Sequence, residues 1–208
     1  MDTFAAIADE RRRLADQLAD LTPEQRAAQS LCDAWTVHDV LAHLTMPLDV
    51  GMARFALAMV LAAGDFDRAN RRLTRRQAAR PYDEIIGLLR RRADSRFTPP
   101  GEGPEAPLTD VLVHGLDIRW PLGLPYDIPE DRAATALDAV MRAPSGVVAK
   151  GVVDGLRFEA TDIDWQHGTG PTVSGSAAAL LLSVTGRAAA VDSLVGDGVV
   201  VLRRRIVR

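Results

Sequence analysis

The sequence predicts an α+β fold in which a four-helix bundle over residues 1–145 is followed by a small α/β domain over residues 150–208. Two observations indicate this order. Apolar residues recur at helical spacing from the N-terminus to about Arg142, whereas Gly155 to Thr161 alternates with the period of two that is typical of a strand. Inward polar side chains also occur on two of the helices, as in a bundle with a site between facing helices. We therefore expect the domain boundary between Arg142 and Val153.

Composition narrows the class of protein. The 208 residues are 47% hydrophobic and 25% charged, which is typical of a soluble globular chain. The net charge of -3 gives no global electrostatic case for nucleic acid or an anionic membrane, so neither is expected as a partner. The charged N-terminus lacks the apolar run of a signal peptide, which predicts a cytoplasmic protein. A single cysteine, Cys32, excludes an internal disulfide and any all-cysteine metal site.

The helices of the bundle are predicted at residues 3–20, 36–63 and 82–92 and around residues 110–119. The start of the second is marked by Thr36 and Asp39, which form the pattern of a capping box. We expect this helix to continue past Pro47, with a kink there, and to end at Gly64. The arginine-rich residues 65–80 show little apolar periodicity. They are predicted to be a solvated connecting segment, in preference to a nucleic-acid-binding arm.

The C-terminal part is predicted to mix helices and strands. The expected elements are a helix from Pro129 to about Arg142, a strand at 155–161, a second strand and turn at 164–173, and a helix capped by Ser174 and closed by Gly186. Residues 194–205 fit either a strand or a short helix. His167 lies in a glycine turn, where a surface residue is a better interpretation than a metal ligand.

The segment from Asp110 to Arg119 is the most informative stretch of the chain. At 100° per residue, Asp110, His114 and Asp117 fall on one narrow stripe of a helix that is otherwise apolar and therefore expected to be buried. Buried ionisable groups are costly unless they pair with one another, accept hydrogen bonds or bind a metal. The spacing of four between Asp110 and His114 suits two ligands to one ion. A buried Asp–His pair that only fixes helix packing is the alternative.

A second histidine is placed to face this stripe. His43 lies on the flank of the core face of the helix that begins at Thr36, from where it can point into the interior of the bundle. Taken alone, His43 is better explained as a histidine at the edge of the core that bonds to a backbone carbonyl.

Taken together, WTVHDVLAHL, DVLVHGLDIRWPLG and GLRFEATDIDWQHGTGPTVSGSAAALLLSVTGR resemble the mycothiol-dependent maleylpyruvate isomerase family, in the DinB-like superfamily. The resemblance implies a DinB-like metal-binding bundle followed by a carrier-protein-like α/β domain. It also implies that His43, Asp110 and His114 bind a divalent ion, usually zinc, although the family often has glutamate where this chain has Asp110. Asp117 is our candidate for a residue that orients a ligand or acts as general base. The alternative for Asp117 is a buried acceptor for Arg119 or a backbone amide.

The same resemblance implies a function. Three ligands leave a coordination position open, as in catalytic zinc sites. Because neither site motif contains a cysteine, the thiol is expected to be supplied by mycothiol, as the resemblance implies. Of the 25 basic residues, 24 are arginine, a bias that fits the GC-rich actinobacteria that make mycothiol. We expect an isomerase or a thiol transferase that acts on a small electrophile. A metal-binding or interaction protein without turnover is the alternative.

Overall fold

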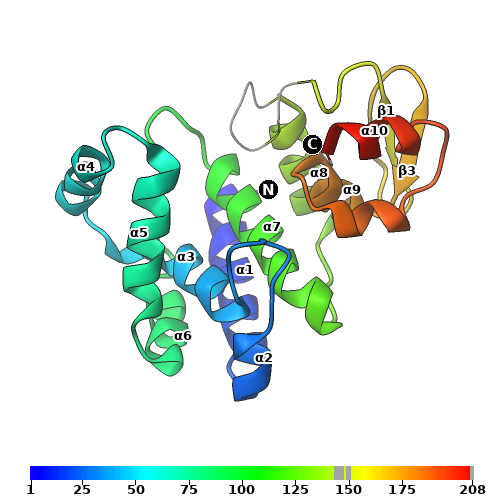
Figure 1. Cartoon of the computed structure of the whole chain (residues 1–208). Coiled ribbons are helices and arrows are strands. Elements are labelled where there is room, and N and C mark those ends of the chain that lie inside the picture. Colours follow the sequence, from blue (N-terminus) through cyan, green and yellow to red (C-terminus); the bar gives the residue numbers. More distant parts are fainter. Residues whose placement is uncertain (143–147, 149–150, 207–208) are drawn as a thin grey trace.

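The computed structural model describes residues 1–142, 148 and 151–206 and confirms the α+β fold (Figure 1). The helices of the larger, N-terminal part are α1 (Thr3–Leu18), α2 (Pro23–Ala27), α3 (Val37–Asp49), α4 (Met52–Leu61), α5 (Phe66–Ala78), α6 (Tyr82–Arg91), α7 (Glu105–Leu122) and α8 (Glu130–Arg142). No helix in the described ranges has both the length and the apolar character that crossing a membrane would require.

Helices α1, α3, α6 and α7 form the bundle, as predicted. Their apolar faces meet in a buried core that includes Leu14, Leu41, Ile85 and Ile118, all of them inaccessible to solvent. Helix α7 is buried on several sides because it contributes to two cores. Ile118 faces the bundle, whereas other positions such as Leu112 face the C-terminal part of the chain. This central position explains why α7 is apolar almost all round, as the sequence suggested.

Two predictions about the second quarter of the chain were wrong. The helix that begins after Thr36 ends at Asp49, and the chain leaves the helical conformation at Val50 and Gly51 before α4 begins. Residues 65–80 are a helix, α5, instead of a connecting segment, and α5 packs along α3. The reason is its composition: Leu73 is the single large apolar residue of its buried stripe, the other members are small or polar, and most of its remaining surface carries arginine. These buried residues are Ala69, Leu73, Thr74 and Gln77.

The capping box at the start of α3 is confirmed. The hydroxyl of Thr36 accepts a hydrogen bond from the backbone amide of Asp39, and the Asp39 carboxylate accepts one from the backbone amide of Thr36 at 2.9 Å. We expect Thr36→Ala to lower the free energy of unfolding by about 1 kcal/mol, because the backbone amide of Asp39 loses its side-chain acceptor, although the amide of residue 36 can still donate to the Asp39 carboxylate. Urea denaturation measures this change. Thr135→Ala, at a half-buried position of α8 where the hydroxyl bonds within its own helix, is the control, and equal losses in both variants would contradict a capping role.

The C-terminal part contains a three-stranded sheet of order β2-β1-β3. Strand β1 (Arg157–Ala160) pairs antiparallel with β2 (Gln166–Gly168) and parallel with β3 (Thr172–Gly175). The remaining elements are α9 (Ala177–Val184), a 3-10 helix (Ala188–Ser193) and α10 (Val199–Ile206). Ser174 was wrongly predicted as the cap of α9, because it lies in β3 and the cap is Ser176. Residues Val199–Ile206 form a helix, so the choice between strand and helix is settled for this segment.

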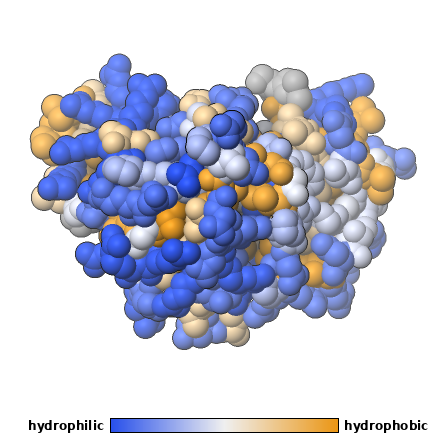
Figure 2. Space-filling model, turned by 90° about the horizontal axis from the view of Figure 1, so that it is seen from below, coloured by the Kyte–Doolittle hydropathy of each residue, from blue (hydrophilic) through white to orange (hydrophobic). Residues whose placement is uncertain are grey.

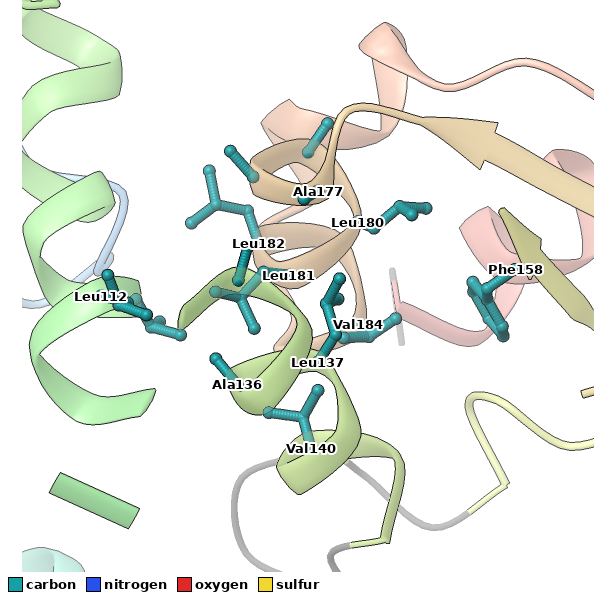
Figure 3. Packing of buried hydrophobic residues seen from close by; sticks show 14 of the residues in the cluster. Leu112, Ala136, Leu137, Val140, Phe158, Ala177, Leu180, Leu181, Leu182 and Val184 are labelled. Atoms are coloured by element: carbon teal, nitrogen blue, oxygen red, sulfur yellow. The ribbon is translucent and has the colours of Figure 1, made fainter. Parts of the chain in front are cut away.

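Helix α8 lies between α7 of the bundle and α9, and α9 in turn packs against the sheet (Figure 3). Ala136, Leu137 and Val140 on α8 belong to one buried cluster with Leu112 on α7 and Leu181 on α9. The two parts of the chain therefore share a core. The predicted boundary between Arg142 and Val153 lies largely outside the described residues, and the division into 1–145 and 150–208 stays a prediction.

Candidate metal site

His43 is held in the bundle by contacts on two sides. It is 8% exposed, and its ring packs against Trp35, whose ring centroid is 4.8 Å away. Its Nδ1 lies 3.5 Å from the hydroxyl of Thr74 on α5. These contacts direct the other ring nitrogen, Nε2, toward α7. Helix α5, which the sequence did not predict, thus helps to orient this histidine.

Asp110 and His114 approach His43 from successive turns of α7. Asp110 Oδ1 lies 3.6 Å from His43 Nε2 and 3.6 Å from His114 Nε2. The two imidazole rings are 4.7 Å apart between centroids and nearly perpendicular. One donor atom from each of the three residues lies within 4.8 Å of the others. The structure therefore brings together all three residues that were predicted as metal ligands.

These distances can be tested against what a metal needs. A separation of 3.6 Å is too long for a hydrogen bond, so neither histidine is bonded to Asp110. Two ligand atoms that each lie at about 2.0–2.1 Å from one tetrahedral zinc ion are separated by about 3.4 Å. The observed spacing is close to this value, and two imidazole nitrogens with one carboxylate oxygen are donors that zinc accepts. The three residues fit a divalent ion, and Asp110 reaches the site despite being shorter than glutamate.

Asp117 supports His114 from the opposite side of the imidazole ring. It is inaccessible to solvent, and its Oδ2 accepts a hydrogen bond from His114 Nδ1 at 2.8 Å. Because an ionised carboxylate only accepts, Nδ1 carries a proton, so Nε2 is the ring nitrogen that a metal would bind after displacing any proton there. Such a carboxylate–histidine pair fixes the tautomer of a metal ligand. Arg119 is not the partner of Asp117: it donates to Gln17 Oε1 at 2.6 Å.

The true cationic partner of Asp117 is Arg187, in the C-terminal part of the chain. Arg187 Nη2 donates to Asp117 Oδ2 at 2.6 Å and Nε donates to Oδ1 at 2.9 Å. Sequence analysis did not identify Arg187, which follows the glycine that ends α9. This bidentate pair links the α/β part directly to the site. Burial alone would raise the pKa of Asp117, but the bonds from His114 and Arg187 hold it well below its ordinary value.

Cys32 also lies against the site, although it is far from both helical motifs in sequence. Its thiol donates to Asp117 Oδ2 at 3.0 Å, and its sulfur lies 3.8 Å from His114 Nδ1. The loop that carries it is attached to α7, because the backbone amide of Leu31 donates to the carbonyl of Asp117. Cys32, His114 and Asp117 form a second group with metal-binding atoms. Arg187 already donates hydrogen bonds to both carboxylate oxygens of Asp117, which makes this second group a poor site for a metal cation.

The protonation of the site should make metal binding depend on pH. Burial would lower the pKa of His114, but hydrogen bonds to Asp117 and Cys32 and the charge of Asp110 outweigh it and raise the pKa to about 10. Below that pH the ring of the metal-free protein is an imidazolium, and a metal must displace its proton. We therefore expect affinity to rise with pH toward that value and about one proton to be released per ion. Calorimetry in buffers of different ionisation enthalpy measures this number, and binding without proton release would contradict it.

The fold and the site can now be compared with known proteins. Residues 7–119, more than half of the chain, match the family model of the mycothiol maleylpyruvate isomerase N-terminal domain. Two solved structures are similar over 94% of this chain and 92% of theirs: the mycothiol-dependent maleylpyruvate isomerase and a mutant of it. Each has a TM-score of 0.62 at 17% identity, which supports a common fold. No curated protein sequence matches the chain. On the strength of the family match, the chain belongs to the mycothiol maleylpyruvate isomerase family.

Proposed function

We propose that the protein is an enzyme that depends on a divalent metal and on mycothiol and acts on a small electrophilic substrate. The observation that carries this proposal is the arrangement of His43, Asp110 and His114, whose donor atoms converge without bonding to one another. Membership of the family supports mycothiol as the thiol, and zinc is the ion that the resemblance of the sequence motifs implies.

Each residue has a distinct task in this proposal. An ion bound by the three ligands would supply one chemical property: it lowers the pKa of a thiol bound to it, so that the thiolate forms near neutral pH. His43 and His114 would bind the ion through Nε2, while Asp110 adds negative charge. Asp117 keeps the tautomer of His114. Because both carboxylate oxygens of Asp117 already accept hydrogen bonds, its contacts favour this positioning role over that of general base.

Two features favour an enzyme over a metal-binding protein without turnover. The Asp110 side chain is 38% exposed, so a small molecule can reach the site. The group formed by His43, Asp110 and His114 has three members in the described part of the chain, which leaves a coordination position for an outside ligand. Cys32 does not supply a fourth ligand, since its sulfur lies on the Nδ1 side of the His114 ring, away from Nε2.

The reaction type has two candidates that differ in the fate of the thiol. In an isomerisation, the thiol adds to a conjugated double bond, a single bond rotates, and the thiol is expelled unchanged. In a transfer, the thiol sulfur stays bonded to the product carbon. Both require a nucleophilic thiolate and an electrophilic carbon. Free thiol is conserved in the first reaction and consumed in the second.

The experiment that tests the proposal combines metal removal with a substrate panel. The protein as purified is analysed for metal, and maleylpyruvate and a series of electrophiles are then assayed with mycothiol. The assay is repeated after chelation and after zinc is restored. We expect turnover of at least one compound that is lost on chelation and regained with zinc, and thiol titration then separates isomerase from transferase. Metal-loaded protein that turns over nothing would support the alternative without catalysis.

A further inference from the structure

One face of the N-terminal part is densely basic. We call it the arginine face and define it by Arg54 on α4 and by Arg68, Arg71, Arg72, Arg75 and Arg76 on α5. All six are exposed, and none takes part in a salt bridge among the described residues. Residues 52–80 contain seven arginines and two aspartates, a local charge of +5 in a chain whose net charge is -3. The rest of the molecule is therefore acidic, and the charge is strongly separated.

Apolar side chains stand among these arginines. Leu57, Val60, Leu61 and Phe66 are 55% to 75% exposed and account for four of the nine large hydrophobic residues that are exposed in the described ranges. The ring of Phe66 meets that of Phe55, with centroids 6.1 Å apart, which ties the start of α5 to α4. In Figure 2, hydrophobic residues gather beside hydrophilic ones at the left edge, the side on which Figure 1 places α4 and α5.

The two kinds of side chain share the same surface. A depression of about 540 Å³ is lined by Leu61 together with Arg68, Arg71, Arg72 and Arg75. A second depression, of about 420 Å³, joins Leu57 and Leu61 to Arg54, Arg72 and Arg76. Apolar groups and guanidinium groups thus form one continuous surface.

We propose that α4 and the arginine face of α5 bind the surface of an anionic lipid bilayer. Leu57, Val60 and Phe66 would enter the boundary between headgroups and acyl chains, and the arginines would contact lipid phosphates, which guanidinium groups bind in bidentate fashion. A soluble polyanion would use the arginines and leave the apolar side chains without a role. A second copy of the chain would place arginine against arginine. This proposal departs from the expectation, based on net charge, that a membrane is not a partner.

The test is vesicle co-sedimentation of the full chain. We expect binding to vesicles of phosphatidylcholine with phosphatidylglycerol that is at least about tenfold stronger than binding to phosphatidylcholine alone and that weakens with salt. The variant Arg71→Gln/Arg72→Gln/Arg75→Gln should lose this preference. Val60→Ser should weaken binding to anionic vesicles while leaving the salt dependence unchanged.

A matched control removes the same charge elsewhere. Arg91→Gln/Arg92→Gln/Arg204→Gln changes three exposed arginines outside the arginine face and should bind anionic vesicles like the wild type. Equal binding to both vesicle types, no binding to either, or equal losses in the two triple variants would overturn the proposal. The proposal would also be overturned if vesicles do not bind but a soluble polyanion does so through Arg71, Arg72 and Arg75. The soluble polyanions to be tested are inorganic triphosphate, an acidic protein and RNA. Metal content should be the same in all variants, which separates this result from the proposed function.

Discussion

Replacing His114 by alanine is expected to abolish metal binding while leaving the fold intact. His114 is the residue on which both sides of the site depend: Nε2 faces Asp110 and His43, and Nδ1 is fixed by Asp117. Losing an outer partner of a ligand costs about 10-fold to 100-fold in metal affinity, and losing the ligand itself from a three-ligand site should cost more. Elemental analysis and calorimetry measure the loss, and turnover should fall with it.

The fold of His114→Ala can be checked independently. Asp117 keeps its two bonds from Arg187, so the buried carboxylate stays paired, and circular dichroism should be unchanged. His43→Ala should lose metal in the same way. His167→Ala is the control, since this histidine lies exposed in β2 outside the site. Stoichiometric metal retained in both His43→Ala and His114→Ala would refute the assignment of these ligands.

Replacing Arg187 by methionine should have the second large effect, on stability. Asp117 would remain buried without its cation, and removing one partner of a buried ion pair costs about 3–5 kcal/mol. We expect a loss of about 3 kcal/mol, because His114 and Cys32 still donate to the carboxylate. The pKa of Asp117 is depressed in the folded protein, so its stabilising effect is present at neutral pH and is lost as the pH falls through that pKa. The variant should therefore unfold at higher pH in acid titrations.

A second substitution shows whether the charge of Asp117 is the cause. In Asp117→Asn/Arg187→Met the uncompensated carboxylate is absent, so the double variant should recover part of the stability that Arg187→Met loses. Urea denaturation of the wild type, Arg187→Met, Asp117→Asn and the double variant measures this coupling. Additive losses, with no recovery in the double variant, would show that Arg187 acts through packing alone.

Most helices could be predicted from the sequence because their determinants are local. The apolar periodicity of α1 and α6 and the capping box at Thr36 act within a few residues of the chain. Helix α5 gave only a weak signal, since Leu73 is the single large apolar residue of its buried stripe, and the helix depends on packing against α3. The break between α3 and α4 at Val50 and Gly51 was not predicted, because the sequence pattern places any irregularity at the proline at position 47. Helix α3 continues through Pro47.

The site could be predicted in part for the same reason. Asp110 and His114 are one helical turn apart, so their proximity follows from their spacing, and His43 was expected to face them from the core side of its helix. Cys32 and Arg187 reach Asp117 from 85 and 70 residues away along the chain, and no local pattern marks them. Only the shared core of α7, α8 and α9 brings Arg187 to this position.

One measurement tests the central claim most directly: absorption spectroscopy of cobalt-loaded protein before and after mycothiol is added. If His43, Asp110 and His114 bind the ion and leave a position open, a sulfur-to-cobalt charge-transfer band should appear only after mycothiol is added. A mycothiol thioether should give no band, Cys32→Ser should behave like the wild type, and His114→Ala should bind no cobalt. Cobalt bound in His114→Ala, a band that exists before mycothiol and disappears in Cys32→Ser, or bound cobalt whose spectrum mycothiol leaves unchanged would contradict the account.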